Sequence, residues 1–196
     1  KEDYPLKPKY PYDTSKACAD FIAQSYASDL YNMPILITRF ANIYGPGQLN
    51  FSALIPDLIR CAIRKREFIP RSDGSSKRDF LFVKDVENLY CSLAENLSNN
   101  RSAYAGEIFN AGTNVEKSVR EVVEKIYQKL NNETGLKKII EKFDEDNIAE
   151  GEINYQSMDY EKVYKNLGWK PKTNFDSGLN YTIEWYKSFL SSENSI

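Results

Sequence analysis

Two residues near the start of the chain, Tyr12 and Lys16, have the types and spacing of an acid–base pair. They stand four positions apart in the stretch PYDTSKACADF, where a helix is expected to begin. Residues four apart share one face of a helix, so the Lys16 ammonium can approach the Tyr12 ring oxygen. A nearby positive charge favours tyrosinate and lowers a pKa of about 10. Such a tyrosine could exchange a proton with a sugar or alcohol hydroxyl near neutral pH, although two solvated residues on a surface helix have the same spacing.

The absence of histidine and the spacing of the cysteines limit the kinds of catalytic and metal site that are possible. The sequence contains no histidine, which excludes a Ser–His or Cys–His triad and a His-ligated metal site within these residues. Cys18, Cys61 and Cys91 are far apart, without a CxxC spacing, and each has apolar neighbours. We therefore expect reduced, buried thiols and no metal site. Acid–base chemistry must then use Tyr, Lys, Asp, Glu or Cys.

Composition indicates a globular protein. Of the 196 residues, 41% are hydrophobic and 28% are charged, and the formal net charge is −2, so there is no basic field for nucleic acid. No run of apolar residues is long enough to span a membrane, and the first residues lack the apolar core of a signal peptide. We expect a cytoplasmic protein. The chain opens without methionine in a polar, proline-rich stretch, which predicts that a natural N-terminal part is missing.

The first half of the chain is expected to place Tyr12 and Lys16 on a helix over residues 13–31, with Asp13 or Thr14 as the N-cap. The apolar stripe of this helix is formed by Ala17, Phe21, Ile22, Tyr26 and Leu30. A buried strand follows in ILITRF (residues 35–40), and then a loop rich in Gly, Pro and Asn. Residues 52–66 are predicted to form a second helix.

In the second half of the chain, predicted strands and helices continue to alternate. We expect strands over residues 80–83, 107–112 and 137–143, and helices over residues 84–97, 118–132, 159–167 and 176–190. Asp85 lies in the first turn of its helix, and Ser118 with Glu121 forms a capping-box pair. The acidic stretch 144–152 is expected to be mobile. Because strands alternate with helices, the predicted fold class is α/β.

Six motifs follow one another in the order found in one enzyme family. They are YPYDTSKACAD, ITRFANIYGPG, LIPDLIRCAI, SDGSSKRDFLFVKDV, GEIFNAG and LGWKPKTNFDSGLNYTIEWY. This series, from about residue 4 to residue 190, resembles the extended short-chain dehydrogenase/reductase family of NAD-dependent nucleotide-sugar epimerases and dehydratases. PYDTSKACAD, GQLNFSALIP, IPRSDGSSKRDF and EINYQSMD are most similar to the CDP-glucose 4,6-dehydratase branch rather than the dTDP-glucose branch.

The resemblance implies a fold and a division of the chain. The fold would be the C-terminal part of a Rossmann-like doubly wound parallel sheet, with a smaller α/β substrate-binding lobe. Residues 1–50 would belong to the NAD-binding domain. Residues 51–196 would mainly form the substrate lobe, with a segment of about 80–97 returning to the sheet. The family's N-terminal G-x-x-G-x-x-G turn, which seats the NAD pyrophosphate, does not occur in this sequence.

The resemblance also implies a reaction, in which bound NAD oxidises the C4 hydroxyl of a nucleotide sugar, water leaves across C5 and C6, and the hydride returns to C6. The product would be a 4-keto-6-deoxy sugar, a precursor in deoxysugar biosynthesis such as that of lipopolysaccharide O-antigen. Tyr12 would remove the C4-hydroxyl proton, and Lys16 would hold the nicotinamide ribose. The backbone at Phe40 would lie against the nicotinamide.

Further residues are expected to bind the nucleotide sugar. By resemblance, Asn42 contacts the diphosphate; the alternative is that Asn42 is only a turn residue. By resemblance, the guanidinium group of Arg78 also binds the diphosphate. Asn110 is expected to bind the nucleotide. Arg71 is a second candidate for the substrate pocket, with a solvated loop arginine as the alternative.

Three details qualify this assignment. Asp79 is expected to orient Arg78 or to cap a local turn. Where relatives carry Lys or Arg for the diphosphate, this chain has Ala53, so Ser52 or Arg60 would have to compensate. The aromatic residues expected to pack the C-terminal lobe are Trp169, Trp185 and Tyr186.

Two other functions fit the same residues. A nucleotide-sugar 4-epimerase or decarboxylase begins with the same C4 oxidation, and the residues that distinguish elimination would lie upstream. A non-catalytic binding module could have kept the substrate lobe alone. The row of small residues Ala19, Ala23 and Ala27 permits close helix approach, and relatives pair through this helix, so a homodimer is expected.

Overall fold

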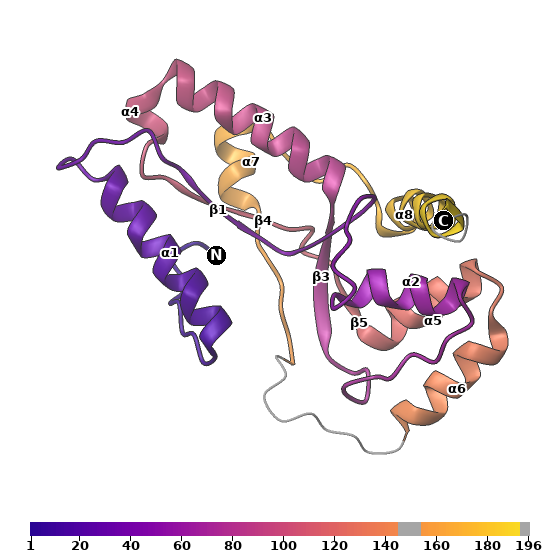
Figure 1. The fold of residues 1–196 in the computed structure, drawn as a ribbon. Helices are drawn as coiled ribbons and strands as arrows, with labels where there is room; N and C mark the ends of the chain where they lie inside the picture. Colours follow the sequence, from indigo (N-terminus) through magenta and orange to yellow (C-terminus); the bar gives the residue numbers. More distant parts are fainter. Residues whose placement is uncertain (145–153, 193–196) are drawn as a thin grey trace.

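The structure is a computed structural model that describes residues 1–144 and 154–192 (Figure 1). The longer helices are α1 (Pro11–Ala27), α2 (Leu54–Ile63), α3 (Val83–Asn99), α5 (Val119–Lys129), α6 (Glu133–Phe143) and α8 (Phe175–Ser192). The short helices are α4 (Arg101–Tyr104) and α7 (Glu161–Leu167). The strands are β1 (Ile37–Phe40), β2 (Asn42–Tyr44), β3 (Lys77–Phe82), β4 (Ile108–Ala111) and β5 (Glu116–Ser118).

Strands β1 and β2 are two halves of one extended segment that changes partner at Ala41. Strand β1 pairs in parallel with β4, from Ile37 opposite Ile108 to Phe40 opposite Ala111. Strand β2 pairs in parallel with β3, which pairs antiparallel with β5 on the chain that follows β4. The carboxyl end of β1 is therefore the point where the two pairings diverge, and α/β proteins bind their ligands at such points.

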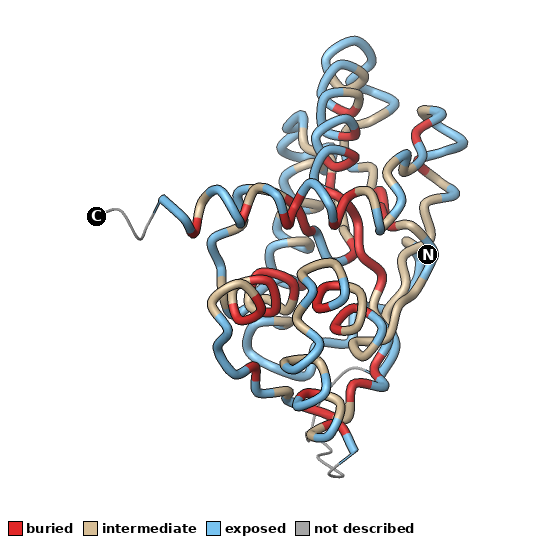
Figure 2. The backbone as a smooth tube through the Cα atoms, turned by 90° about the vertical axis from the view of Figure 1, so that its right-hand side faces the viewer, coloured by how far each residue is buried: buried red, intermediate tan, exposed pale blue. Residues whose placement is uncertain are grey.

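Two apolar clusters hold the elements together. The larger one joins α2, α5, α6 and α8 to β3, and includes the fully buried Leu58, Ile126 and Tyr186. The smaller one joins α3, α7 and β4 around Leu89 and Trp169. Figure 2 shows the buried residues in red at the centre of the molecule, on the inward sides of the helices. Trp185 and Tyr186 pack in the larger cluster, as predicted for the C-terminal lobe, whereas Trp169 packs in the smaller cluster with residues of α3 and β4.

Helix α1 begins earlier than the sequence predicts, because Pro11 is its first residue and Tyr10 is the N-cap. Proline suits this position, since its missing N–H needs no partner there. The prediction of Asp13 or Thr14 as the N-cap was wrong. The Thr14 hydroxyl instead donates back to the Tyr10 carbonyl at 3.0 Å. The earlier start places both Tyr12 and Lys16 inside the helix.

The region after α5 is helical where a strand was expected. Residues 137–143 belong to α6, whose N-cap Asn132 accepts the Gly135 N–H at 3.0 Å. The window 137–143 is too short to reveal the helical spacing of the apolar residues, which becomes clear once Leu136 is included. The capping box of α5 between Ser118 and Glu121 is confirmed. Of the stretch 144–152 that was expected to be mobile, residues 145–152 lie outside the described residues.

The three cysteines are free, but only Cys61 is buried. Cys18 and Cys91 are exposed, because they lie on the outer faces of α1 and α3, so the expectation of three buried thiols was wrong. Burial raises the pKa of the Cys61 thiol to about 11, which keeps this thiol protonated at neutral pH. Within the described part of the chain, no helix is both long and apolar enough to cross a membrane.

Candidate active site and substrate cavity

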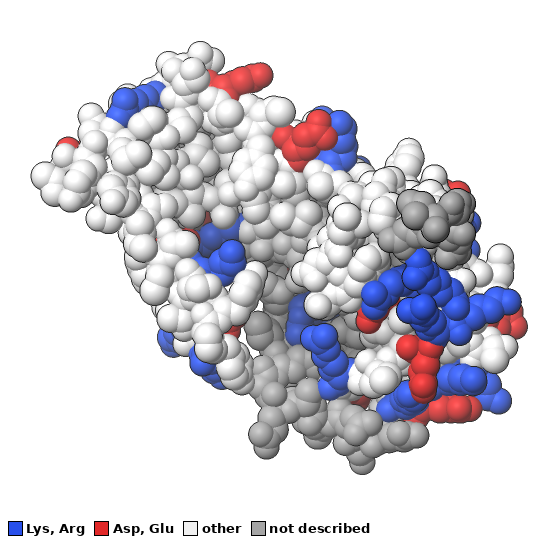
Figure 3. Space-filling view, in the orientation of Figure 1, with Lys and Arg blue, Asp and Glu red and all other residues white. Residues whose placement is uncertain are grey.

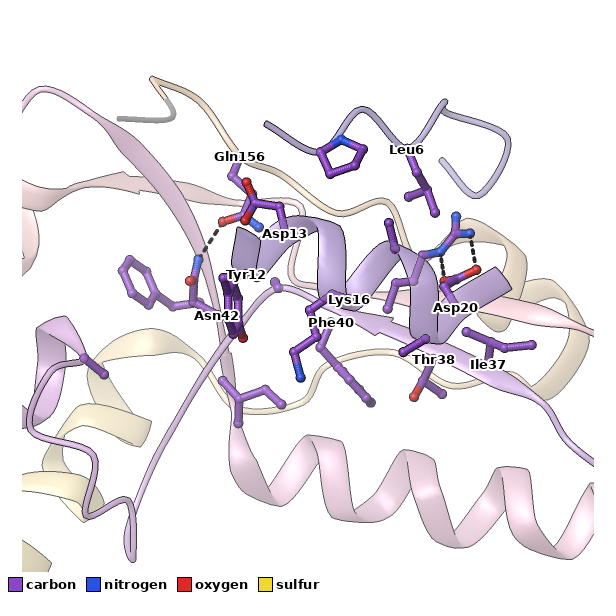
Figure 4. Close-up of a pocket in the computed structure, with 18 of the residues that line it drawn as sticks. Leu6, Tyr12, Asp13, Lys16, Asp20, Ile37, Thr38, Phe40, Asn42 and Gln156 are labelled. Carbon is purple, nitrogen blue, oxygen red and sulfur yellow. Dashed lines mark hydrogen bonds and ion pairs between the residues drawn. The ribbon is translucent and has the colours of Figure 1, made fainter. Parts of the chain in front are cut away.

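A cavity of about 1120 Å³ lies between α1 and the β1–β2 segment. Its wall includes Tyr12 and Lys16 from α1, and Phe40 and Asn42 from the point where β1 ends (Figure 4). This volume is slightly larger than the roughly 300–1,000 Å³ of most small-molecule sites. The predicted catalytic pair and the predicted nicotinamide contact thus share one cavity with the predicted substrate contact Asn42.

The side chains of Tyr12 and Lys16 are both exposed to this cavity. Tyr12 is 71% exposed, and the Lys16 ammonium lies over its ring, 5.4 Å from the ring centroid. This is a cation–π contact with the ring face, and not the contact with the ring oxygen that the spacing suggested. Among residues 1–144 and 154–192, neither the Tyr12 hydroxyl nor the Lys16 ammonium has a hydrogen-bond partner. A ribose diol supplies both donors and acceptors, so these groups fit the sugar portion of a dinucleotide.

An ion pair holds the helix of this pair on the sheet. Arg39 of β1 donates through Nε to Asp20 Oδ2 at 2.8 Å and through Nη2 to Asp20 Oδ1 at 3.0 Å. Both side chains are largely buried. Gln24 also donates to Asp20, and hydrogen bonds from Arg39 and Gln24 lower the pKa of the Asp20 carboxyl. Asp20 follows Lys16 by one turn, so the ion pair fixes the part of α1 that carries Lys16.

A second cavity of about 440 Å³ lies beside the first, under α2 and the loop that leads to β3. The two cavities share Asn42, Ala53, Leu54 and Phe80 in their walls. The described wall of the second cavity carries four arginines and two acidic residues. The arginines are Arg60, Arg66, Arg71 and Arg78. Both acidic residues form ion pairs. Asp57 pairs with Arg60 of the same wall, and Glu67 pairs with Lys142, which is not among the described wall residues.

The excess positive charge makes this second cavity suited to an anionic group. Ser52, Arg71 and Arg78 line it together, as the predicted substrate contacts would require. Arg60 lies close enough to serve there, but its guanidinium already pairs with Asp57 and stacks on the Phe51 ring at 4.4 Å.

Asp79 caps a turn, which was one of its two predicted roles. Its carboxylate is fully buried and accepts the backbone N–H groups of Thr113 at 3.0 Å, Asn114 at 3.2 Å and Met158 at 3.3 Å. This carboxylate ties the end of β4 and the segment before α7 to β3. The backbone groups that it binds thus come from two segments, residues 113–114 and Met158.

Asn42 uses its amide nitrogen within the protein. Nδ2 donates to the Asp79 carbonyl at 3.0 Å and to Gln156 Oε1 at 2.9 Å. Gln156 also lines the first cavity, and Figure 4 shows the hydrogen bond between the two amides as a dashed line. Gln156 lies within the motif EINYQSMD, but it was not identified as a site residue, because its contact with Asn42 spans 114 positions of the sequence.

Asn110 lies apart from these residues. It is buried in β4 opposite Arg39 and is absent from the described walls of both cavities. Its backbone N–H donates to the Glu2 carboxylate at 2.8 Å. Its side-chain Oδ1 has no hydrogen-bond partner among the described residues. The predicted contact of Asn110 with the nucleotide stays a prediction.

Comparison with known proteins points to one family. Residues 1–182 match the family model described as GDP-mannose 4,6 dehydratase. The chain is 33% identical over 196 residues to a dTDP-D-glucose 4,6-dehydratase of Mus musculus, with 95% of this chain and 50% of that protein covered. It is 34% identical over 191 residues to a dTDP-glucose 4,6-dehydratase of Haemophilus influenzae, with 94% and 54% covered.

A solved structure gives the same picture. The crystal structure of a dTDP-glucose 4,6-dehydratase from Bacillus anthracis in complex with NAD is similar with a TM-score of 0.77 and 32% identity. The similarity covers 96% of this chain and 55% of that one. The chain therefore spans about half the length of the relatives it matches. The predicted α/β class with Rossmann-like parallel strands is confirmed.

Proposed function

The chain belongs to the family described as GDP-mannose 4,6 dehydratase, and from this premise we propose that the protein containing it is an NAD-dependent nucleotide-sugar 4,6-dehydratase. One observation carries the proposal. The cavity that holds Tyr12 and Lys16 adjoins an arginine-rich cavity at Asn42. A nucleotide sugar has the same two parts, a sugar that reacts and a diphosphate that binds to positive charge. A single substrate could therefore occupy both cavities.

Three residues would hold the cofactor and start the reaction. Lys16 would donate to the nicotinamide ribose, since its ammonium faces the cavity beside Tyr12. The backbone at Phe40 would line the nicotinamide position. Tyr12 would accept the proton of the sugar C4 hydroxyl and later return it. When bound, NAD supplies the acceptor and donor of the hydride.

The diphosphate would lie in the second cavity. Arg78 and Arg71 offer guanidinium groups that can each pair with two phosphate oxygens. The Ser52 hydroxyl can donate one more hydrogen bond. These contacts would compensate for Ala53, which stands where relatives have a basic residue.

The net reaction is the loss of one water from the sugar. C4 loses a hydride and a proton and becomes a ketone, and C5 loses a proton while C6 loses hydroxide, which leaves a C5–C6 double bond. C6 then receives the hydride and C5 receives a proton, so that the net loss is one water. We assign no residue of this chain to the elimination step. Residues 1–50 are proposed to belong to the cofactor domain, and residues 51–196 mainly to the substrate lobe, with a segment of about 80–97 returning to the sheet.

The nucleotide is proposed to be cytidine. Four motifs resemble the CDP-glucose branch, whereas the relatives described above are named for dTDP-glucose. A cytoplasmic location is part of the same proposal, and three free cysteines are consistent with it. A homodimer through α1 is also proposed, because Phe21, Ile22 and Tyr26 of this helix are exposed.

The proposal is tested with the complete gene product that contains this sequence. It is incubated with NAD and, in turn, with CDP-, dTDP-, UDP- and GDP-glucose, and the products are weighed by mass spectrometry. Loss of one water from one of them supports the dehydratase and identifies the nucleotide. An isomeric sugar of unchanged mass would indicate an epimerase. Loss of carbon dioxide, when a nucleotide uronic acid is supplied instead, would indicate a decarboxylase. No turnover and no NAD binding would indicate a binding module.

A further inference from the structure

The junction of the two cavities is formed by a pair of side-chain amides, Asn42 and Gln156. Asn42 lines both cavities and Gln156 lines the first. They come from strand β2 and from the segment before α7, and Figure 4 shows their side chains pointing toward one another. Their hydrogen-bonding groups determine what part of a ligand this junction can accept.

The orientation of the Asn42 amide is set by a backbone carbonyl. Its Nδ2 lies 3.0 Å from the Asp79 oxygen, and only the nitrogen of an amide can donate there. The other N–H of Nδ2 donates to Gln156 Oε1 at 2.9 Å. Both donors of Asn42 are thus in use, and its acceptor Oδ1 remains for a ligand. The Asp79 carbonyl cannot readily move, because the Asp79 side chain is fully buried and holds three backbone N–H groups.

Gln156 has a free hydrogen-bond donor, whereas Asn42 has a free acceptor. Its backbone N–H donates to the Lys77 carbonyl at 3.0 Å, and the Lys77 N–H donates to Asn154 at 2.9 Å. These bonds hold the segment against β3 like a short extra strand. Gln156 Oε1 is occupied by Asn42, which leaves the two N–H groups of Nε2. Among the described residues, no acceptor lies within hydrogen-bond distance of Nε2.

We propose that Gln156 is a specificity-determining residue that, together with Asn42, recognises a hydroxyl group of the sugar. The pair presents one acceptor, Asn42 Oδ1, next to one donor, Gln156 Nε2. A hydroxyl both donates and accepts and matches this arrangement. A phosphate oxygen only accepts, so an amide oxygen would face it unfavourably. The inference rests on the proposed function, and it moves Asn42 from the diphosphate to the sugar.

The test compares ligands with and without the sugar. Isothermal titration gives the affinities of the NAD-loaded complete gene product for CDP-glucose and CDP, and for dTDP-glucose and dTDP. Gln156→Leu keeps the size of the side chain and removes both amide groups. We expect it to bind the nucleotide sugar roughly fivefold to tenfold more weakly, the effect of about one lost neutral hydrogen bond, and to bind the free nucleoside diphosphate as before.

The unchanged affinity for the diphosphate also shows that the variant is folded. Gln128→Leu, an exposed glutamine of α5, is the matched control and should change neither affinity. Arg71→Gln should weaken both ligands, because its guanidinium faces the diphosphate cavity. Equal weakening of both ligands by Gln156→Leu, or no weakening, would overturn the inference. A wild-type protein that binds none of the four ligands would overturn the proposed function and the inference with it.

Discussion

At the scale of single residues, Arg39 and Asp20 connect the candidate acid–base pair to the sheet. The carboxylate accepts two hydrogen bonds from one guanidinium and a third from Gln24. Bidentate pairs of this kind combine strength with a defined orientation. Because Asp20 lies one turn after Lys16, a change at Asp20 should reach the site through the helix without touching a ligand.

Replacing Asp20 with Asn should destabilise the protein. The variant leaves the Arg39 charge largely buried without its counter-ion, at a cost of about 2 kcal/mol. We expect a lower melting temperature in a thermal scan at pH 7. Asp29→Asn is the control, because Asp29 is an exposed acid just after the end of the same helix and should shift stability by less than about 0.5 kcal/mol.

The same substitution predicts a pH dependence. The pKa of Asp20 is lowered in the folded protein, so its contribution is fully present above the unfolded value of about 3.9. This stabilisation is lost as the pH falls through the pKa that Asp20 has in the folded protein. The difference in melting temperature between wild type and Asp20→Asn should therefore shrink below about pH 4. A difference that stays constant down to pH 3 would argue against a role for the ionised carboxylate.

Lys16→Met should weaken NAD binding while keeping the helix intact. The variant retains the length of the side chain and removes a charged hydrogen-bond donor, which corresponds to an affinity loss of roughly tenfold or more. Fluorescence titration of the complete gene product with NAD measures the effect. Lys9→Met, at an exposed lysine outside the described cavity walls, should leave the affinity unchanged. Equal affinities for wild type and Lys16→Met would contradict the cofactor role.

Local patterns made some of these residues predictable and left others hidden. Tyr12 and Lys16 can be found from sequence, because a four-residue spacing on a helix needs no knowledge of the rest of the chain. The same holds for Arg78 of the KRD stretch once the family motifs are aligned. Gln156 and the Asp20–Arg39 pair depend on contacts between distant segments, and no local spacing encodes them.

At the scale of elements, the change of partner at Ala41 opens the site. The Ala41 N–H still bonds to the Ala111 carbonyl at 2.9 Å, and the next residue, Asn42, already pairs with β3. Strand β1 lies in the predicted apolar run, but β2 lies in the stretch that was predicted as a loop, so that prediction was wrong for residues 42–44. The pairing of the strands was not predicted, since strand partners are set by contacts across the chain. The position of Asn42 at the junction of the two cavities follows from this change of partner.

The helices show which sequence signals are sufficient. The capping box of α5 is a local device, and the sequence alone located its start at Ser118. The paired apolar residues Ile139 and Ile140 favour a strand over residues 137–143, and this prediction was wrong, because these residues belong to α6. A full helical face extends from Leu136 to Phe143, and this face is visible only in a longer window.

Helix α8 approaches β2 so closely that Gly178 has no room for a side chain. A Cβ at this position would contact the Tyr44 hydroxyl and lie 2.9 Å from Phe82 Cδ2. Gly178→Ala should therefore destabilise the protein by about 1–3 kcal/mol, although alanine favours helices by about 1 kcal/mol. A thermal scan measures the change. Ser188→Ala, at an exposed position of the same helix, is the control, and a stabilised Gly178→Ala would contradict the close packing.

At the scale of the whole molecule, charge and apolar surface lie in different places. Figure 3 shows Lys and Arg side chains gathered over the part built from α2, α5 and α6, while the surface over α1 and α3 carries few charged groups. Phe21, Ile22 and Tyr26 of α1 are exposed, as is Leu30 just after the helix. A continuous apolar face of this kind is typical of an interface.

The proposed homodimer predicts that a charge on this face separates the subunits. Ile22→Glu should convert the complete gene product from a dimer into a monomer, because a buried unpaired carboxylate at an interface is strongly unfavourable. Light scattering after size-exclusion chromatography gives the mass. Val115→Glu, at another exposed apolar residue, should leave the dimer intact. A wild-type monomer, or a dimer that survives Ile22→Glu, would contradict the proposal.

The central claim is that Tyr12 transfers the proton that starts the loss of water from a nucleotide sugar. The most direct measurement is the rate of water loss by the complete gene product, with NAD and its preferred nucleotide-glucose, for wild type, Tyr12→Phe and the exposed control Tyr4→Phe. The account predicts that Tyr12→Phe lowers the rate about 10²- to 10⁴-fold, with substrate affinity retained and Tyr4→Phe unchanged. A Tyr12→Phe variant that turns over at the wild-type rate would contradict it.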